Sequence, residues 1–243
     1  MAVCPSAVSP NLLWVASYGG FIWAIDWTTG NGSQDHVALS CDRLYDISVD
    51  SVKIGNEMRN IIYVSSKDKQ ACKVTAYDIQ NLKVVASKTV FSHTSAIENV
   101  RAAHRGHIFA AYADRDIILG THRNDTLSTL EDLIYEVITL DASDQITCMD
   151  IRVSSRVHLS RRSQREVNDA AVVDIVIGSA RGVVFVYNDL LPQIRALHNS
   201  NTRHHALQPR KYHWHRRAVH AVKWSGDGTK AAPENSLPAT NAS

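Results

Sequence analysis

Short apolar runs joined in pairs by tight polar turns are the dominant pattern along this chain. The first pair is Leu12–Ser17 and Phe21–Trp27, joined through Tyr18-Gly19-Gly20. The runs are rich in Val, Ile, Tyr and Phe and either alternate or are continuously apolar, as expected of strands packed between other layers. The turns contain Gly, Asp or Lys, which suit positive φ or solvent exposure. The other pairs are Ile61–Ser65 with Cys72–Ile79, His107–Tyr112 with Asp116–Thr121, and Val172–Gly178 with Val183–Asn188.

The spacing of the turns is that of a repeat protein. Successive turns lie roughly 45 to 50 residues apart and then about 67 before the fourth, and a WD40 blade of four strands has a period of roughly 40–45 residues. The polar stretch Ser154–Ala170 explains the longer third interval as a loop inserted within one blade. Tyr77-Asp78-Ile79 and Ile25-Asp26-Trp27 stand where the third strand of a WD blade ends, usually in Trp-Asp. Further strands are expected at Lys83–Thr89, Ala96–Ala102 and Gln145–Arg152.

Helical periodicity is nearly absent. In Leu127–Ile138 the residues Leu130, Ile134 and Val137 share a helical face, and Asp125 could cap it, but Tyr135–Leu140 reads equally as a strand.

A fifth unit begins near the end of the sequence. His220–Trp224 followed by Ser225-Gly226-Asp227-Gly228 is typical of a WD-blade opening, whereas the residues after it are almost without apolar side chains. We therefore expect an all-β fold, an incomplete WD40-type β-propeller of about four blades plus the first strand of another. The expected organisation is a partial propeller over residues 1–228, with a basic insertion at 154–170, and a disordered tail at 229–243. Such an arc indicates either a fragment of a longer protein or one completed by a partner.

Composition restricts the function less than the repeat does. The net charge of +2 does not indicate an anionic partner. Only local clusters of basic residues can indicate one. Cys4, Cys41, Cys72 and Cys148 are scattered, without metal-ligand spacing, and indicate reduced thiols in an intracellular compartment. The N-terminus lacks the features of a signal peptide and no apolar run is long enough to span a membrane, so a nuclear or cytosolic protein is expected.

A histidine-rich segment raises the question of a metal site. His213 and His215, two residues apart, would share one face of a strand, near His204, His205 and His220. Zinc requires a third or fourth ligand, commonly Cys or a carboxylate, yet no cysteine is near and no acidic residue occurs from Thr202 to Lys223. We therefore expect no metal and no cofactor. In WD repeats a histidine near the start of a blade hydrogen-bonds within that blade, and His215 is assigned this structural role.

Two basic clusters are candidates for RNA contact. Guanidinium groups pair with phosphates and aromatic rings stack on unpaired bases, and the second cluster is interleaved with Tyr212 and Trp214. The alternative is a solvated, charged loop surface. Trp214 is expected to pack between blades rather than on a base, and Trp224 and Asp227 are likewise assigned to blade structure. The RNA-contact candidates are Arg156, Arg161, Arg162 and Arg165 in the first cluster and Arg210, Lys211, Arg216 and Arg217 in the second.

Enzyme signatures are missing from the sequence. There is no GxSxG, HExxH or P-loop, and Gly178–Gly182 lies in a strand–turn–strand hairpin rather than before a helix, where a phosphate site would need it. Asp114 and Asp116 are spaced like turn residues without a neighbouring His or Ser. We expect no enzymatic activity and no small-molecule substrate.

Two segments carry a resemblance to a known family. Tyr212-His213-Trp214-His215 and Ala218–Gly228 resemble a blade opening of the Nan-type family, also called the WD-repeat-containing protein 75 family. The order of elements is also similar: a basic insertion, the strand pair Gly178–Tyr187, and a His/Arg-rich connection. The resemblance covers roughly residues 10–228, the first part of that family's first propeller, and the rest of that propeller, the second propeller and the C-terminal region are not matched.

The resemblance implies a nucleolar function. Members of this family are non-enzymatic subunits of the t-UTP (UtpA) subcomplex of the small-subunit processome, which supports RNA polymerase I transcription of pre-rRNA and 18S rRNA processing. It implies other processome WD-repeat proteins and pre-rRNA as partners, without a membrane. The alternative is a generic WD-repeat adaptor for protein interactions outside the ribosome pathway.

Overall fold

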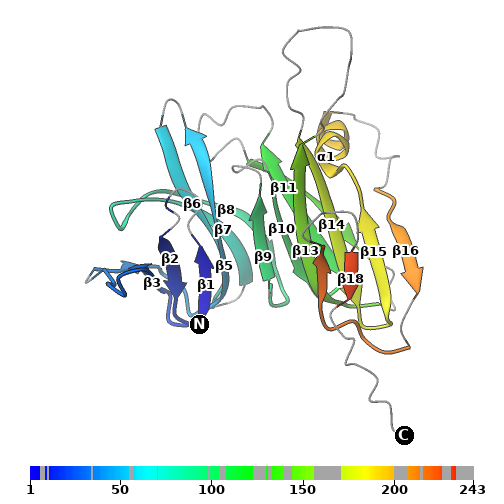
Figure 1. Cartoon of the computed structure of the whole chain (residues 1–243), viewed down its shortest axis with the longest axis horizontal. Helices are drawn as coiled ribbons and strands as arrows, with labels where there is room; N and C mark the ends of the chain where they lie inside the picture. The colour runs from blue at the N-terminus through cyan, green and yellow to red at the C-terminus, as the bar shows by residue number, and fades with distance from the viewer. Residues whose placement is uncertain are drawn as a thin grey trace, which may run out of the picture. The chain divides into compact units, whose positions relative to one another are not determined.

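The computed structural model is built mainly from antiparallel β-sheets, which contain about half of the chain (Figure 1). The described residues are 1–5, 9, 11–33, 35–54, 57–69, 71–97, 99–103, 108–122, 130, 133–139, 144–155, 171–199, 207–213, 216–225 and 231–233. They form two compact units, Met1–Ser143 and Asp144–Ser243. Within the described part of the chain no helix is long and apolar enough to cross a membrane.

The first unit contains three sheets of four strands, each built from strands consecutive in the sequence. Neighbouring strands pair antiparallel in sequence order, which is the connectivity of a propeller blade. The first sheet is β1 (Ala2–Pro5), β2 (Leu12–Ala16), β3 (Phe21–Asp26) and β4 (Val37–Ala38); the second is β5 (Arg43–Ile54), β6 (Glu57–Asp68), β7 (Ala71–Gln80) and β8 (Lys83–His93); the third is β9 (Asn99–Ala103), β10 (Ile108–Ala113), β11 (Asp116–His122) and β12 (Leu133–Thr139).

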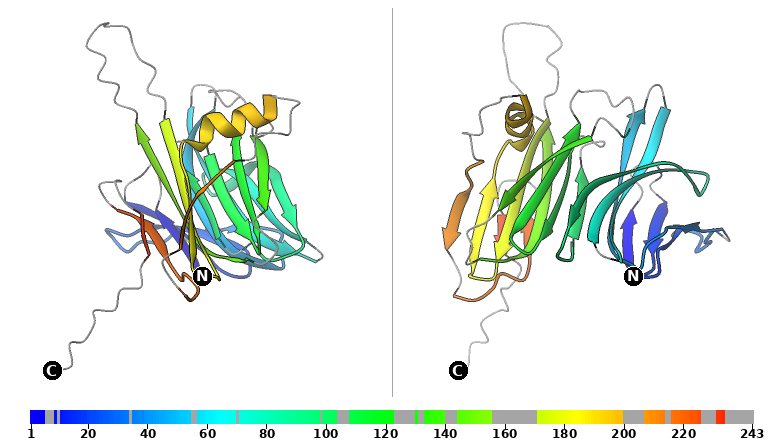
Figure 2. Two further views of the ribbon diagram at one scale, coloured as in Figure 1. Left: turned by 90° about the vertical axis from the view of Figure 1, so that its right-hand side faces the viewer. Right: turned by 180° about the vertical axis from the view of Figure 1, so that it is seen from behind.

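The second unit holds a fourth such sheet and part of a fifth. The fourth is β13 (Ile146–Ser155), β14 (Ala171–Ser179), β15 (Val183–Tyr187) and β16 (Arg210–His213), and the fifth is the pair β17 (Val222–Trp224) and β18 (Ala231–Pro233). The helix α1 (Leu190–Asn199) lies across one end of the fourth sheet (Figure 2). Ser155 pairs with Ala171, so residues 156–170 join two adjacent strands of one sheet.

Apolar faces of consecutive sheets pack on one another within each unit. Trp14 and Ile22 of the first sheet share a cluster with Leu44 and Ile62 of the second. The opposite face of the second sheet packs against the third, around the fully buried Tyr63. In the second unit β17 packs on the fourth sheet around Val176, Val184, Val219 and Val222. Both faces of an internal sheet are therefore buried, which explains the continuous apolar runs of the sequence.

The turns between the second and third strands adopt the backbone that their residue types predict. Gly20, Lys69, Asp114 and Gly182 have positive φ values of 82°, 35°, 53° and 81°, a region that only Gly enters freely and that Asp tolerates. At Gly20 a Cβ would also lie 2.8 Å from the carbonyl oxygen of Leu39. A side chain at this position is excluded by both conformation and space.

The expected fold class is confirmed: this is an all-β, incomplete WD40-type β-propeller, with four four-stranded sheets and part of a fifth. The predicted strand pairs all occur, and the further strands expected before and after them are found in β8, β9 and β13. Of the two interpretations of residues 127–140, the strand holds for Leu133–Thr139.

Two expectations about local structure are wrong. The helix α1 was not predicted, although Leu190 and Ile194 are fully buried at helical spacing and Pro192 lies in the first turn, where a missing N–H costs nothing. The residues after Gly228 were expected to form no strand, yet Ala231–Pro233 pairs with Val222–Trp224. Backbone pairing does not require apolar side chains, so composition gave no warning of it.

Candidate functional site

The second basic cluster lies on an edge strand of the fourth sheet. Among described residues β16 pairs only with β15, in the register Phe185↔Lys211 and Val186↔Arg210. Arg210, Lys211 and His213 are exposed. Charged side chains on an edge strand also discourage pairing with other chains, so this placement alone does not identify a ligand.

The aromatic residue within this strand is committed to packing. Tyr212 is half-buried against the apolar cluster that contains Val184 and Val219. The ammonium group of Lys211 lies 5.7 Å from the centre of the Phe185 ring, at the outer limit of a cation–π contact. The described edge therefore offers cationic groups rather than a stacking platform.

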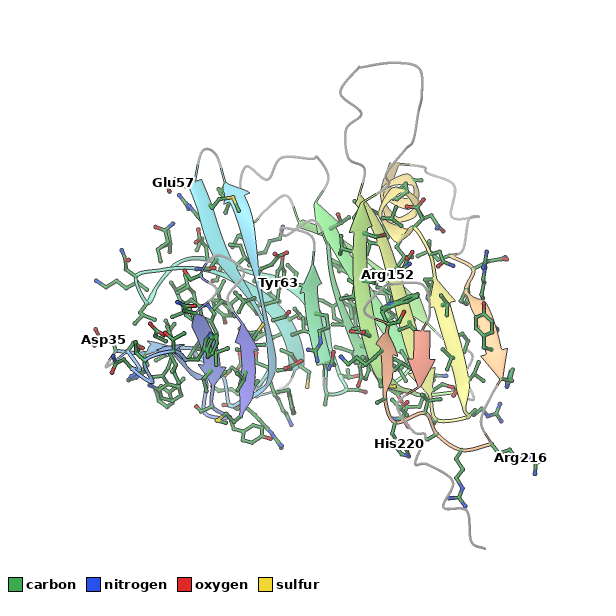
Figure 3. All side chains as sticks on the ribbon, in the orientation of Figure 1. Asp35, Glu57, Tyr63, Arg152, Arg216 and His220 are labelled. Atoms are coloured by element: carbon green, nitrogen blue, oxygen red, sulfur yellow. The ribbon has the colours of Figure 1, made fainter. Side chains whose placement is uncertain are left out.

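Arg216 and Arg217 extend this basic edge on the segment that leads to β17. Both are exposed, and Figure 3 shows Arg216 pointing away from the sheet. The segment is fixed at Val219, whose N–H donates to the Ser179 carbonyl at 3.0 Å and whose carbonyl accepts from the hydroxyl of Thr147. Together Arg210, Lys211, Arg216 and Arg217 form what we call the basic edge. The other predicted positions, Arg156, Arg161, Arg162, Arg165, Trp214, His215 and Asp227, lie outside the described residues.

A repeated hydrogen bond joins the first strands of consecutive sheets. The Oδ2 atom of Asp46 in β5 accepts from the N–H of Val100 in β9 at 3.0 Å, and Oδ2 of Asp150 in β13 accepts from the N–H of Trp224 in β17, also at 3.0 Å. Between the first two sheets Sγ of Cys4 occupies the same role, 3.3 Å from the N–H of Val49.

Charged partners reinforce these inter-sheet hydrogen bonds. Nη1 of Arg101 lies 2.9 Å from Oδ2 of Asp46, and Nζ of Lys223 lies 3.5 Å from Oδ1 of Asp150. These carboxylates are therefore engaged in holding sheets together.

Trp224 belongs to a second cluster in the same unit. The Arg152 guanidinium lies 4.3 Å from the centre of the Trp224 ring and is paired with Asp174, with Nε at 3.1 Å from Oδ2. Asp174 is only 2% exposed and also accepts from the N–H of Asp189 at 2.9 Å. The arrangement links β13, β14 and β17, so the described surroundings of Trp224 are those of a structural residue.

His93 was overlooked by sequence reasoning, and the statement that Asp116 lacks a neighbouring histidine is wrong. Nε2 of His93 lies 3.1 Å from Oδ2 of Asp116, and Nδ1 accepts from the N–H of Ser95 at 2.9 Å. Since Nδ1 is an acceptor, the ring proton is on Nε2 and is donated to the carboxylate.

Asp42 and Asp144 make the corresponding contact in other sheets. Asp42 accepts from the N–H of Lys69 at 2.6 Å and Asp144 accepts from the N–H of Arg181 at 3.3 Å. Asp42 lies directly before β5 and Asp144 two residues before β13, whereas His93 ends β8. Each contacts the turn between the second and third strands of a sheet or the residue that follows that turn. Two of these three contacts are made by an aspartate and one by a histidine. A search of the sequence for histidines would therefore find only the contact of His93.

No group of three or more His, Cys, Asp or Glu side chains converges as a metal site within the ranges that the structure describes. His213 and His220 are both exposed, while His204, His205 and His215 are outside those ranges. The four cysteines are unpaired with one another. Burial raises the pKa of the Cys4, Cys41 and Cys148 thiols, which disfavours the reactive thiolate.

A shallow hollow at one end of the second sheet is lined by polar side chains. Arg59 lies beside it and pairs with the buried Asp78 at 2.8 Å and with Glu57 at 3.2 Å. Asp78 is the aspartate that follows Tyr77 in the position of a WD dipeptide. Its carboxylate is held by a neighbouring strand, as expected of a structural residue.

The described sheets, their order and their contacts define the chain as a WD-type propeller protein. The β-propeller domain of Cps50 (Swd1) from Myceliophteria thermophila is a similar solved structure, with a TM-score of 0.55 at 11% identity. The match covers 95% of this chain and 60% of that chain, so the present sequence spans about three fifths of the length of that domain. No family model and no curated protein matches the chain. The likeness supports the fold.

Proposed function

We propose that the chain is a non-enzymatic WD-repeat scaffold of the small-subunit processome, acting in the nucleolus in pre-rRNA transcription and 18S rRNA processing. The resemblance of Tyr212–His215 and Ala218–Gly228 to the WD-repeat-containing protein 75 family supports this assignment. The partners would be other processome WD-repeat proteins and pre-rRNA.

The basic edge is the single structural observation that carries the RNA contact. Its four cationic side chains are exposed, and no Asp or Glu occurs between residues 190 and 226. Exposed guanidinium and ammonium groups attract the phosphate backbone without reading its sequence. The predicted contact is therefore salt-dependent and sequence-independent.

RNA binding is tested with the whole chain and a fluorescent single-stranded RNA, titrated at several salt concentrations. Replacing Arg216 and Arg217 by Ala should remove about two phosphate contacts and flatten the slope of log K against log [salt] by about 1.4. The matched control is Lys67→Ala with Lys83→Ala, which removes two exposed positive charges from the second sheet. Equal slopes for the two double variants would refute a specific role for the basic edge.

The cellular role is tested by location and by depletion. The protein should concentrate in the nucleolus and co-purify with pre-rRNA, and its depletion should cause unprocessed small-subunit precursor to accumulate. Normal precursor levels after depletion would refute the processome assignment. The alternative, a WD-repeat adaptor outside the ribosome pathway, predicts protein partners whose co-purification survives RNase treatment.

A further inference from the structure

The segment between β3 and β4 contains the one Asn-Gly dipeptide of the sequence, Asn31-Gly32. Both residues are exposed. In such a dipeptide the backbone nitrogen of Gly can attack the side-chain amide carbon of the preceding Asn. The attack closes a five-membered ring, and Gly has no Cβ to obstruct it. The reactivity of Asn31 therefore depends on whether the fold leaves both groups free.

The hydrogen bonds around this dipeptide leave the nitrogen of Gly32 unengaged. The N–H of Asp26 donates to the Asn31 carbonyl and that of Ser33 donates to a carbonyl of β3, both at 2.9 Å. These two bonds flank the bridge between Ile25 and Gly32, which is therefore a non-hydrogen-bonded pair. The N–H of Gly32 points away from β3, and within the described part of the chain it meets no acceptor.

The side chain of Asn31 is unconstrained as well. Its backbone N–H donates to Oγ1 of Thr29 at 3.3 Å, whereas its side-chain amide makes no hydrogen bond with any residue that the structure describes. The surrounding backbone is loosely packed. A Cβ at Gly30 would meet no atom within 4 Å, and one at Gly32 would lie 3.9 Å from Cγ1 of Ile25, its nearest neighbour. The Asn31 side chain is therefore free to turn toward the nitrogen of Gly32.

We propose that Asn31 is a site of covalent modification by deamidation. The nitrogen of Gly32 gives up its proton and attacks Cγ of Asn31. A C–N bond forms, and the side-chain NH2 group takes up a proton and leaves as ammonia, which produces a cyclic succinimide. Water then opens the ring. Cleavage of the bond between the ring nitrogen and Cγ leaves aspartate, and cleavage of the bond to the main-chain carbonyl carbon leaves isoaspartate. Water is the only co-reactant.

The two products have different effects on the first sheet. Aspartate adds a negative charge and keeps the main chain as it is. Isoaspartate routes the main chain through its side chain, which inserts one extra carbon before Gly32. The hydrogen bonds of Asp26 and Ser33 then lose their register. Because β4 pairs with β3 over the two residues Val37–Ala38, no long strand resists this shift. Isoaspartate should therefore loosen the outer part of the sheet.

This modification is independent of the proposed RNA contact, because it lies in the first unit and involves none of the basic edge. It is tested on the whole chain, incubated at neutral and at mildly alkaline pH in water enriched in heavy oxygen, then digested in ordinary water and analysed by mass spectrometry. Asn31 should convert to isoaspartate and aspartate that carry the label, which excludes conversion during digestion. The rate should rise with pH because the nucleophile is the deprotonated nitrogen.

Asn11 is an internal control in the same sample. It is exposed like Asn31, but it is followed by Leu12, whose N–H donates to the Ser9 carbonyl at 3.0 Å. A bulky side chain and an engaged nitrogen should both prevent ring closure, so Asn11 should stay unmodified. A synthetic peptide of residues 26–36 supplies the rate of Asn31 without the fold.

Gly32→Ala tests the role of the glycine. The added Cβ fits, since its nearest neighbour would be 3.9 Å away, but it obstructs the attack and restricts the backbone. Conversion of Asn31 should slow at least about threefold. Asn31→Asp carries the charge of one product on an unchanged main chain. Hydrogen exchange at the amides of Asp26 and Ser33 should accelerate in the purified isoaspartate product and stay slow in Asn31→Asp.

Each result decides for or against the proposal. Labelled conversion of Asn31 in the folded chain at a rate within about tenfold of that of the peptide, with Asn11 unchanged, supports it. Conversion of the peptide but not of the folded chain, equal rates at Asn31 and Asn11, or an undiminished rate in a folded Gly32→Ala variant would overturn it. Should that variant fail to fold, as judged by circular dichroism, the comparison with the peptide and Asn11 decides.

Discussion

The pair formed by Arg152 and Asp174 provides the sharpest test of how the second unit is held together. Asp174→Asn keeps the size of the side chain and an acceptor for the N–H of Asp189, but removes the charge that faces Arg152. The Arg152 side chain is 23% exposed and that of Asp174 only 3%. Loss of one partner of a buried pair costs about 3–5 kcal/mol. Partial hydration of Arg152 lowers the expected loss of stability to about 2–3 kcal/mol.

A double-mutant cycle separates the pair from the individual residues. Arg152→Met leaves Asp174 buried without its cation and also removes the stacking on Trp224. We therefore expect it to lower the free energy of unfolding by about 3–4 kcal/mol. The double variant should lose less than the sum of the two, with a coupling energy of at least about 1.5 kcal/mol. Urea unfolding followed by tryptophan fluorescence measures each value. Additive effects, or a loss below about 0.5 kcal/mol for Asp174→Asn, would refute the reasoning.

Two further predictions follow from local geometry. Gly178→Ala should destabilise the fold by about 1–3 kcal/mol because its Cβ would lie 2.6 Å from Sγ of Cys148 and 2.7 Å from Cγ1 of Val219; thermal unfolding should show partial recovery when Val219→Ala is added, and a Tm unchanged by Gly178→Ala would contradict the steric argument. The pKa of Asp26 is depressed by its hydrogen bonds with Thr28, so its contribution to stability is present above the unfolded pKa and is lost as pH falls through the folded value. Acid titration of stability below about pH 4 should therefore be shallower for Asp26→Asn than for the wild type, and identical curves would exclude this contribution.

The repeat was readable from the sequence because each blade has a central strand pair that is buried on both faces. Pairs such as Ile61–Ser65 with Cys72–Ile79 were predicted from their apolar runs and polar turns, and they form the middle of the second sheet. The positive φ at Asp114 and Gly182 follows from the same turn chemistry. Local pattern is sufficient here because the burial and the turn are both local properties.

Other strands were predicted only in part or not at all because their burial is uneven. β8 was expected over Lys83–Thr89 but runs on to His93 with mostly exposed side chains, and no apolar pattern marks β16, in which only Tyr212 is half-buried. The position of β16 depends on backbone pairing with β15, which lies more than twenty residues earlier in the sequence. Such pairing is set by the sheet as a whole rather than by the residues of the strand itself.

The candidate site was predictable only in part. The basic composition around Arg210 and Arg216 was visible in the sequence, and the structure places both at the surface. The inter-sheet hydrogen bonds of Asp46 and Asp150 were not predictable because donor and acceptor are separated by 54 and 74 residues in the sequence. The exposed position of Phe21 was missed for a similar reason, since Phe21 and Trp23 look like core residues until the opposite face of β3 is known to be the buried one.

The hydrogen bonds from Cys4, Asp46 and Asp150 have a consequence for how such a protein can evolve. Each requires an acceptor on one blade, but the donor on the next blade is a backbone N–H, which any residue except proline supplies. The receiving residue can therefore change its own side chain without losing this hydrogen bond. Repeats joined in this way can differ in sequence at the receiving position and keep the same contact, as Val49, Val100 and Trp224 do here.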